Sequence, residues 1–123
     1  MSVYSNIFNM ISITTGIDIV DVKRLRKIPY KKMNDFYKKN FNSNEIKYCN
    51  KFKDPYPHFA GKFALKESFL KAIRKPIPMI KINTKHGSLG EPIINCSSIK
   101  CKKIEASISH DKNYAIANVV IIW

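Results

Sequence analysis

The sequence predicts a single α+β domain, in which an antiparallel sheet packs with one long helix and several shorter ones. Three observations predict this fold class: one strand pattern near the N-terminus, a group of helical patterns after it, and a run of strand patterns at the end. The chain has 123 residues, enough for one domain with a hydrophobic core but not for two. We expect an N-terminal extension over residues 1–10 and a single domain over residues 11–123.

The first strand pattern begins at Ile11. In this segment isoleucines alternate with small or polar residues, and this two-residue period is typical of a β-strand. The side chain of Asp18 therefore points away from the isoleucine face. Aspartate is disfavoured in strands. Asp18 either caps the helix that follows or, with the small Gly16 nearby, reaches a ligand or a cation.

Helical patterns fill the middle of the chain. Short helices are expected over residues 22–28, 31–39 and 42–52. The last of these begins with Asn42 and Glu45 at the spacing of a capping box. Residues 56–74 give the clearest helix, because apolar residues recur there at positions i, i+3, i+4 and i+7. Pro76 and Pro78 end it.

Strand patterns follow the prolines. We expect strands over residues 79–84, 92–95, 104–110 and 114–123, with turns between them. The last run is apolar on both parities, which predicts a strand covered on both faces.

The charge and the cysteines narrow the class of protein. Twenty-two Lys and Arg against nine Asp and Glu give a net charge of +13, and such a field attracts nucleic acid, phosphorylated cofactors or acidic proteins. The three cysteines form no disulfide framework and no zinc motif, which favours a reducing compartment. No apolar run is long enough to span a membrane and no secretory signal is recognisable, so we expect no membrane association.

Glu67 and His110 are the other candidates for chemistry. Glu67 lies on the apolar stripe of the long helix, where a carboxylate is costly unless it is paired or bound to a metal. Lys71, four residues later, can form a plain helical ion pair with it. Asp18 and Glu67 together suggest a magnesium site with oxygen ligands, although a salt-bridge network also fits. His110 ends a strand, where it serves phosphate binding, proton transfer or packing.

Three blocks, in order, carry a resemblance to a known family. They are GIDIVDVKRL (16–25), HFAGKFALKESFLKAI (58–73) and SISHDKNYAIANVV (107–120). Between them stand FNSNEIKYC (41–49) and GSLGEPII (87–94), the latter with Glu91 in place of the usual lysine. The chain resembles the holo-acyl-carrier-protein synthase branch of the phosphopantetheinyl transferases, from about Thr15 to Val120.

The resemblance implies a magnesium-dependent enzyme. Such an enzyme moves the 4'-phosphopantetheine arm of coenzyme A to a serine of an acidic acyl carrier protein, releasing 3',5'-ADP. Asp18 and Glu67 would hold the metal. The implied catalytic residues are Asp18, Glu67, Lys71 and His110. The implied coenzyme A ligands are Lys62, Lys66, Lys71 and His110. The implied carrier-docking residues are Lys23, Arg24, Arg26 and Lys27. Similar proteins are homotrimers that share each active site between adjacent subunits.

Besides Glu91, the chain departs from the family at two further places. Lys62 replaces an arginine, so a bidentate phosphate contact there becomes a single one. The segment from Arg74 to Pro78 replaces a glycine-rich turn.

Two rival interpretations stay open at this point. A small basic nucleic-acid-binding module would use the charge and exposed aromatic residues, but it gives no reason for Asp18 and Glu67, so we expect no nucleic acid. An inactive family member serving as a structural trimer subunit is the second rival. The expected compartment is the cytoplasm, with a plastid-type organelle of a eukaryote as the alternative.

Overall fold

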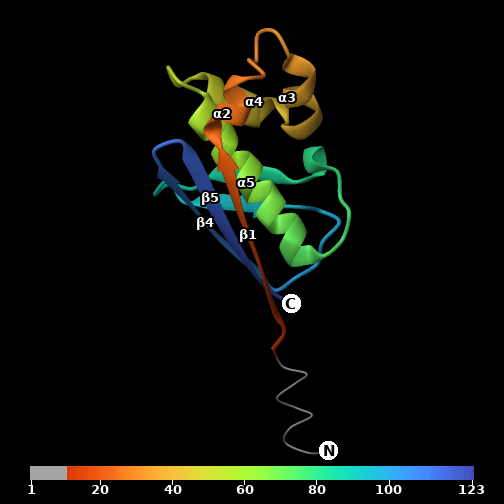
Figure 1. Ribbon diagram of the computed structural model, residues 1–123. Helices are drawn as coiled ribbons and strands as arrows, with labels where there is room; N and C mark the ends of the chain where they lie inside the picture. Colours follow the sequence, from red (N-terminus) through yellow and green to blue (C-terminus); the bar gives the residue numbers. More distant parts are fainter. Residues whose placement is uncertain (1–10) are drawn as a thin grey trace, which may run out of the picture.

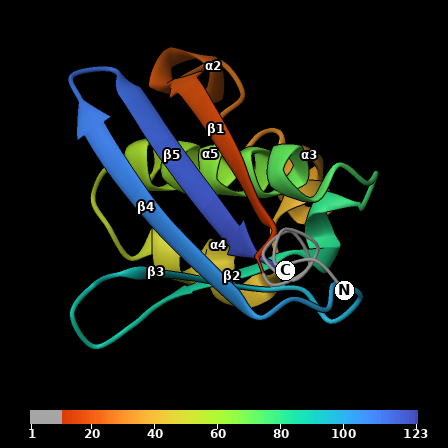
Figure 2. The ribbon, with the colours of Figure 1, turned by 90° about the horizontal axis from the view of Figure 1, so that it is seen from below.

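A computed structural model describes residues 11–123, so the predicted N-terminal extension lies outside the described residues. A three-stranded antiparallel sheet has the order β1-β5-β4. Its strands are β1 (Ile13–Asp21), β4 (Lys103–Asp111) and β5 (Tyr114–Ile122). A second, two-stranded antiparallel sheet pairs β2 (Asn83–His86) with β3 (Pro92–Asn95). The helix α5 (Tyr56–Ile73) crosses one face of the larger sheet (Figure 1; Figure 2). The predicted α+β class is confirmed.

Three shorter helices gather around one end of α5 (Figure 1). They are α2 (Val22–Arg26), α3 (Asn34–Asn40) and α4 (Ser43–Asn50), and the 3₁₀ turn η1 (Met79–Lys81) follows α5 in the chain. The predicted capping box begins α4: the Asn42 side chain accepts from the N–H of Glu45 at 2.9 Å, and the N–H of Asn42 donates to Oε1 of Glu45 at 2.8 Å.

The long helix ends where the prolines predict, and Arg74 takes a left-handed conformation with φ of 57°. Glycine usually occupies such a position, because a side chain is strained there. The region after it differs from the prediction. Residues 79–84 form the turn η1 and only the start of β2, because the N–H groups of Lys81 and Ile82 bond back to Pro78 and Met79 at 2.9 and 3.1 Å.

The larger sheet is covered on one face only. The buried side of β5 carries Ala115, Ala117, Val119 and Ile121, whereas the residues between them are only partly buried. The expectation that β5 is covered on both faces is therefore not met within one chain. On the same outer face, the isoleucines of the first strand pattern are more than half exposed; they are Ile11, Ile13, Ile17 and Ile19.

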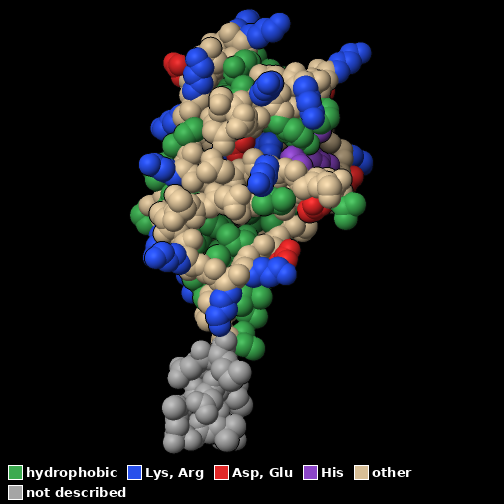
Figure 3. Space-filling view, turned by 180° about the vertical axis from the view of Figure 1, so that it is seen from behind, with side chains coloured by type: hydrophobic (Ala, Val, Ile, Leu, Met, Phe, Trp, Pro, Cys, Tyr) green, Lys and Arg blue, Asp and Glu red, His purple; other side chains and the backbone are tan. Residues whose placement is uncertain are grey.

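Lys and Arg side chains are spread over the whole face that Figure 3 displays, with few Asp and Glu among them. No helix within residues 11–123 is both long and apolar enough to cross a membrane. The structure therefore presents an open apolar sheet face within a broadly basic surface.

Candidate active site

Asp18 lies on β1 beside the second half of α5, and Lys71 reaches it from the helix. The Lys71 ammonium donates to the backbone oxygen of Ile17 at 2.8 Å and lies 3.3 Å from Oδ1 of Asp18. The residue that caps α2 is Asp21, whose side chain accepts from the N–H of Lys23 at 3.0 Å. Asp18 is therefore not the helix cap that the sequence also allowed, and its carboxylate faces the helix.

Glu67, one turn before Lys71 on α5, is half-buried and lies within the electrostatic reach of Asp18. Burial raises the pKa of Glu67, and the Asp18 carboxylate raises it further, while Lys71 and Arg24 oppose the rise. Within the described chain, the ion pair of Lys71 goes to Asp18 and not to Glu67. The two carboxylates therefore lie near two cationic side chains, of which Lys71 is paired with Asp18 and Arg24 acts on Glu67 without a direct ion pair.

The two carboxylates come together because β1 approaches α5 very closely. A Cβ added to Gly16 would lie 1.8 Å from the backbone oxygen of Ser68, so only glycine fits there. The Ser68 hydroxyl donates to the backbone oxygen of Ala117 on β5 at 3.0 Å. Gly16 precedes Asp18 by two residues and Ser68 follows Glu67 directly. This contact between β1 and α5 is therefore next to both Asp18 and Glu67, and it fixes the strand relative to the helix there.

The oxygen donors of Asp18 and Glu67 fit a hard divalent cation. Magnesium is usually held by one or two carboxylates and fills its other positions with water and substrate phosphates. No cluster of three or more His, Cys, Asp or Glu suited to a metal occurs within residues 11–123, so the protein groups here form an open site at most. A cavity of about 370 Å³ adjoins Asp18 and is lined by Ile17, Asp18, Ile19, Lys71 and Ile116. Magnesium binding at this pair stays a prediction.

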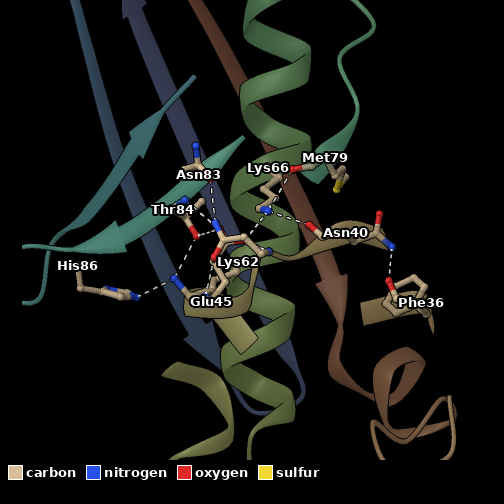
Figure 4. Close-up of polar contacts among 10 residues, drawn as sticks. Phe36, Asn40, Glu45, Lys62, Lys66, Met79, Asn83, Thr84 and His86 are labelled. Carbon is tan, nitrogen blue, oxygen red and sulfur yellow. Dashed lines mark hydrogen bonds and ion pairs between the residues drawn. The ribbon is translucent and has the colours of Figure 1, made fainter. Parts of the chain in front are cut away.

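Lys66, a predicted coenzyme A ligand, lies on the side of α5 that faces α4 and η1 and is fully buried (Figure 4). Its ammonium lies 2.7 Å from Oε1 of Glu45 and donates to the backbone oxygens of Asn40 and Met79 at 2.7 and 3.1 Å. These bonds use all three of its hydrogens. The geometry argues against direct contact between Lys66 and a phosphate and favours a structural role.

Lys62 lies one turn earlier on the same side of α5 and is only 3% exposed. Its ammonium donates to the Thr84 hydroxyl at 3.0 Å and lies 3.4 Å from Nε2 of His86 and 4.8 Å from the ring centre of Tyr48 (Figure 4). Burial lowers the pKa of Lys62. The group lines a cavity of about 390 Å³, so it remains placed to meet an anion that enters there.

The side chain of His110, on β4, contacts the start of α5, away from Asp18 and Glu67. Its Nε2 is 2.9 Å from the backbone oxygen of Pro57, and a Cβ added to Gly61 would lie 3.2 Å from the same nitrogen. Glu67 is six residues beyond Gly61, about 9 Å along the helix axis. One chain therefore does not bring His110 into contact with Asp18 and Glu67, and its predicted roles stay predictions.

The four predicted docking residues are exposed on α2 and just after it. Arg26 differs from the others, because its guanidinium forms two bonds to Asp54, at 3.0 and 2.8 Å, and lies 5.8 Å from the ring centre of Tyr56. Arg24 is close enough to Glu67 to lower the pKa of that carboxyl. The surface of α2 therefore adjoins the acidic pair, with Arg26 tied to the neighbouring loop.

These observations join a metal-compatible acidic pair, nearby cations and an adjacent basic helix in one α+β domain. The family model described as the 4'-phosphopantetheinyl transferase superfamily matches residues 14–119 of this chain. The chain belongs to this superfamily. A holo-[acyl-carrier-protein] synthase of Thermodesulfovibrio yellowstonii is 42% identical over 108 residues, which cover 86% of this chain and 95% of that protein.

Solved structures of this type of phosphopantetheinyl transferase share the fold. A holo-(acyl-carrier-protein) synthase from Bacillus anthracis, in complex with CoA (3',5'-ADP), matches with a TM-score of 0.80 at 27% identity, covering 91% of this chain and 97% of that one. The Helicobacter pylori holo-[acyl-carrier-protein] synthase, in complex with coenzyme A, matches with a TM-score of 0.78 at 33% identity, covering 87% of this chain and 98% of that one. The predicted family, fold and enzyme class are confirmed.

The sequence interpretation missed the second role of Glu45. Besides closing the capping box, its carboxylate pairs with Lys66 and accepts from the N–H of Thr84 at 2.8 Å and from the Thr84 hydroxyl. A signal was present, because Lys66 follows Ala64 and Leu65 on an apolar helix, and a buried lysine needs an anion. The sequence did not indicate which of the nine acidic residues supplies it.

Proposed function

We propose that this chain transfers the 4'-phosphopantetheine arm of coenzyme A to a serine of an apo-acyl carrier protein and releases 3',5'-ADP. The observation that carries the proposal is the close approach of β1 to α5 at Gly16 and Ser68, which puts Asp18 within electrostatic reach of Glu67 and beside the half-exposed side chain of Lys71. Membership of the superfamily and the coenzyme-bound relatives support it. Cleavage of a pyrophosphate needs charge neutralisation and positioning more than covalent chemistry.

Asp18 and Glu67 would hold Mg²⁺, which supplies positive charge at the pyrophosphate when bound. Burial and the Asp18 carboxylate raise the pKa of Glu67, and a cation bound between the two carboxylates would offset both effects. Lys71 would bring its ammonium to a phosphate oxygen, since its side chain is 54% exposed and its bond to Asp18 is long. Both contacts strengthen as charge builds on the leaving group.

Lys62 and His110 would contact the remaining phosphates of coenzyme A. Both lie toward the start of α5, on sides that do not face Asp18 in one chain. A homotrimer that shares each site between adjacent subunits would reconcile these positions. The exposed isoleucines of β1 and the half-covered outer face of β5 support such an assembly, because large apolar patches mark interfaces. Sedimentation equilibrium should give three times the mass of one chain, and a monomer at micromolar concentration would contradict the trimer.

An acidic carrier protein would dock on α2 through Lys23, Arg24 and Lys27. These side chains are exposed and Arg24 lies within electrostatic reach of Glu67, so a serine carried on the docked partner would reach the pyrophosphate. Arg26 would support the surface through Asp54 and not through the partner. The cytoplasm, or a plastid-type organelle, stays a prediction as the compartment.

The decisive experiment incubates the chain with coenzyme A, Mg²⁺ and an apo carrier protein, followed by mass spectrometry of the carrier. We expect the mass of one phosphopantetheine arm on a serine, lost with a chelator and restored by Mg²⁺. An unmodified carrier under these conditions, together with tight and salt-dependent nucleic-acid binding, would favour the basic binding module instead.

A further inference from the structure

Glu67 stands between two residues of α5 that are tied down on opposite sides of the helix. Ser68, the residue after it, bonds to Ala117 of β5 and touches the strand at Gly16. Lys66, the residue before it, is held by three acceptors on the other side (Figure 4). Successive helical residues point about 100° apart. A rotation of α5 that moved Glu67 away from β1 would therefore break the bonds at both neighbours.

The hydrogen bonds and the ion pair of Lys66 link α5 to four other segments. The ammonium joins α5 to the end of α3 through Asn40 and to η1 through Met79. Its ionic partner Glu45 is fixed by the first turn of α4 and by Thr84 of β2. Both charged side chains are 0% exposed. No buried side-chain polar atom among the described residues lacks a hydrogen-bond partner, so this network is fully satisfied.

The acidic pair needs such a tie. The direction in which Glu67 points depends on how far α5 is turned about its axis, and the sheet holds this helix on one side only, at Ser68. Catalytic contacts lose their effect when a group moves by about 1 Å. A helix held only on its sheet side could turn about that contact and move Glu67 away from β1.

We infer that Glu45 and Lys66 are a positioning pair for the transferase reaction, holding α5 at the rotation that presents Glu67 to Asp18. Neither residue touches substrate in this role. The inference rests on the proposed function, because it assigns Glu67 to the metal-bound pyrophosphate. It also explains why a lysine beside the reactive glutamate is buried and not directed to a phosphate.

The test compares full-length Glu45→Gln/Lys66→Met with wild type and with Ile94→Val, a core substitution on β3 outside the network. The double variant removes both charges together, so no unpaired ion is left buried and the chain keeps its fold. Circular dichroism checks the fold. Activity is divided into kcat and the KM for the carrier, and Mn²⁺ binding in the presence of coenzyme A is measured by the electron paramagnetic resonance of free Mn²⁺.

We expect the double variant to lose about 10²-fold in kcat and to bind Mn²⁺ more weakly, with the carrier KM unchanged. Ile94→Val should keep both values. A folded double variant with wild-type kcat and Mn²⁺ affinity overturns the inference, as does an equal loss in Ile94→Val. Should the double variant not fold, Glu45→Asp, which keeps the charge but shortens the reach, decides by the same two readouts. Failure of the proposed function is seen separately, as a wild-type chain that modifies no carrier.

Discussion

The two sides of α5 carry charged clusters of opposite character. On the side of α4 and β2, Glu45 and Lys66 are fully buried, 2.7 Å apart, and every donor of the ammonium is used. On the side of β1, the half-exposed Lys71 lies 3.3 Å from Asp18, whereas Glu67 has no ion-pair partner within the described chain and its pKa is raised by burial and by Asp18. The fold satisfies charge where it holds elements together and leaves charge unsatisfied where a ligand is expected.

The largest expected effect is on activity. Glu67→Gln should lower kcat on the order of 10³-fold, because an amide cannot replace a carboxylate at a cation. The chain should still fold, since the two side chains have the same shape. Transfer of the arm, followed by mass spectrometry, gives the rate. The matched control is Glu91→Gln in the exposed β2–β3 turn, which should keep wild-type activity. Unchanged turnover in Glu67→Gln would remove the metal role.

The second prediction compares the stability of the two sides. Lys66→Met should cost about 3–5 kcal/mol in the free energy of unfolding, because it leaves the Glu45 carboxylate buried and unpaired. Lys71→Met should cost no more than ~1 kcal/mol, since the Lys71 side chain is 54% exposed. Urea unfolding of both variants measures the difference. Similar losses of unfolding free energy in the two variants would contradict the difference between a structural ion pair at Lys66 and a weakly stabilising one at Lys71.

A smaller effect is expected at the docking surface. Arg24→Glu should raise the KM for the carrier about 10-fold at low salt, because it reverses a charge that attracts an acidic partner. The dissociation constant for coenzyme A, measured by calorimetry, should change little. Lys100→Glu, at an exposed lysine outside α2, controls for net charge. Equal weakening of carrier and coenzyme A binding by Arg24→Glu would contradict the docking role.

The smallest expected effect is on the pH dependence of stability. The pKa of Glu67 is higher in the folded chain than its ordinary value of 4.5, so the folded state holds this proton more tightly than the unfolded state does. Wild-type stability should therefore fall as pH rises from 4.5 through the raised pKa. Glu67→Gln should be more stable than wild type at pH 7, by less than ~1 kcal/mol because the side chain is only partly buried.

This gain should vanish below the ordinary pKa of a glutamate, where the wild-type side chain is protonated in both states. Thermal unfolding of the metal-free chain across this pH range measures it. A gain that grows as pH falls would show that Glu67 is stabilised, and not strained, in its carboxylate form.

The sequence predicted the features that depend on local spacing. The capping box at Asn42 and the end of α5 before Pro76 follow from neighbours in the chain, and both are as expected. The magnesium site at Asp18 and Glu67 was predicted because charged residues interrupt two otherwise apolar patterns, and it stays a prediction. The misses depend on tertiary contacts.

The sequence allowed a helical ion pair between Lys71 and Glu67, but the structure pairs Lys71 with Asp18 of β1 instead. Lys66 was expected at the coenzyme, but Glu45, 21 residues away, takes its ammonium. Residues 79–84 have a strand-like composition, but hydrogen bonds back to Pro78 and Met79 turn the chain first. The spacing of hydrophobic residues along the chain predicts which side chains are buried. Which charged side chains form ion pairs depends on tertiary contacts, and these follow only from the packed fold.

A crystal structure of the chain with coenzyme A and Mn²⁺, using the anomalous signal of manganese, tests the metal role of Asp18 and Glu67. We expect one peak bridging the carboxylates of Asp18 and Glu67 and an oxygen of the pyrophosphate, with Lys66 still bound to Glu45. A peak that contacts neither carboxylate, or a pyrophosphate bound on the side of α4 and β2, would contradict it.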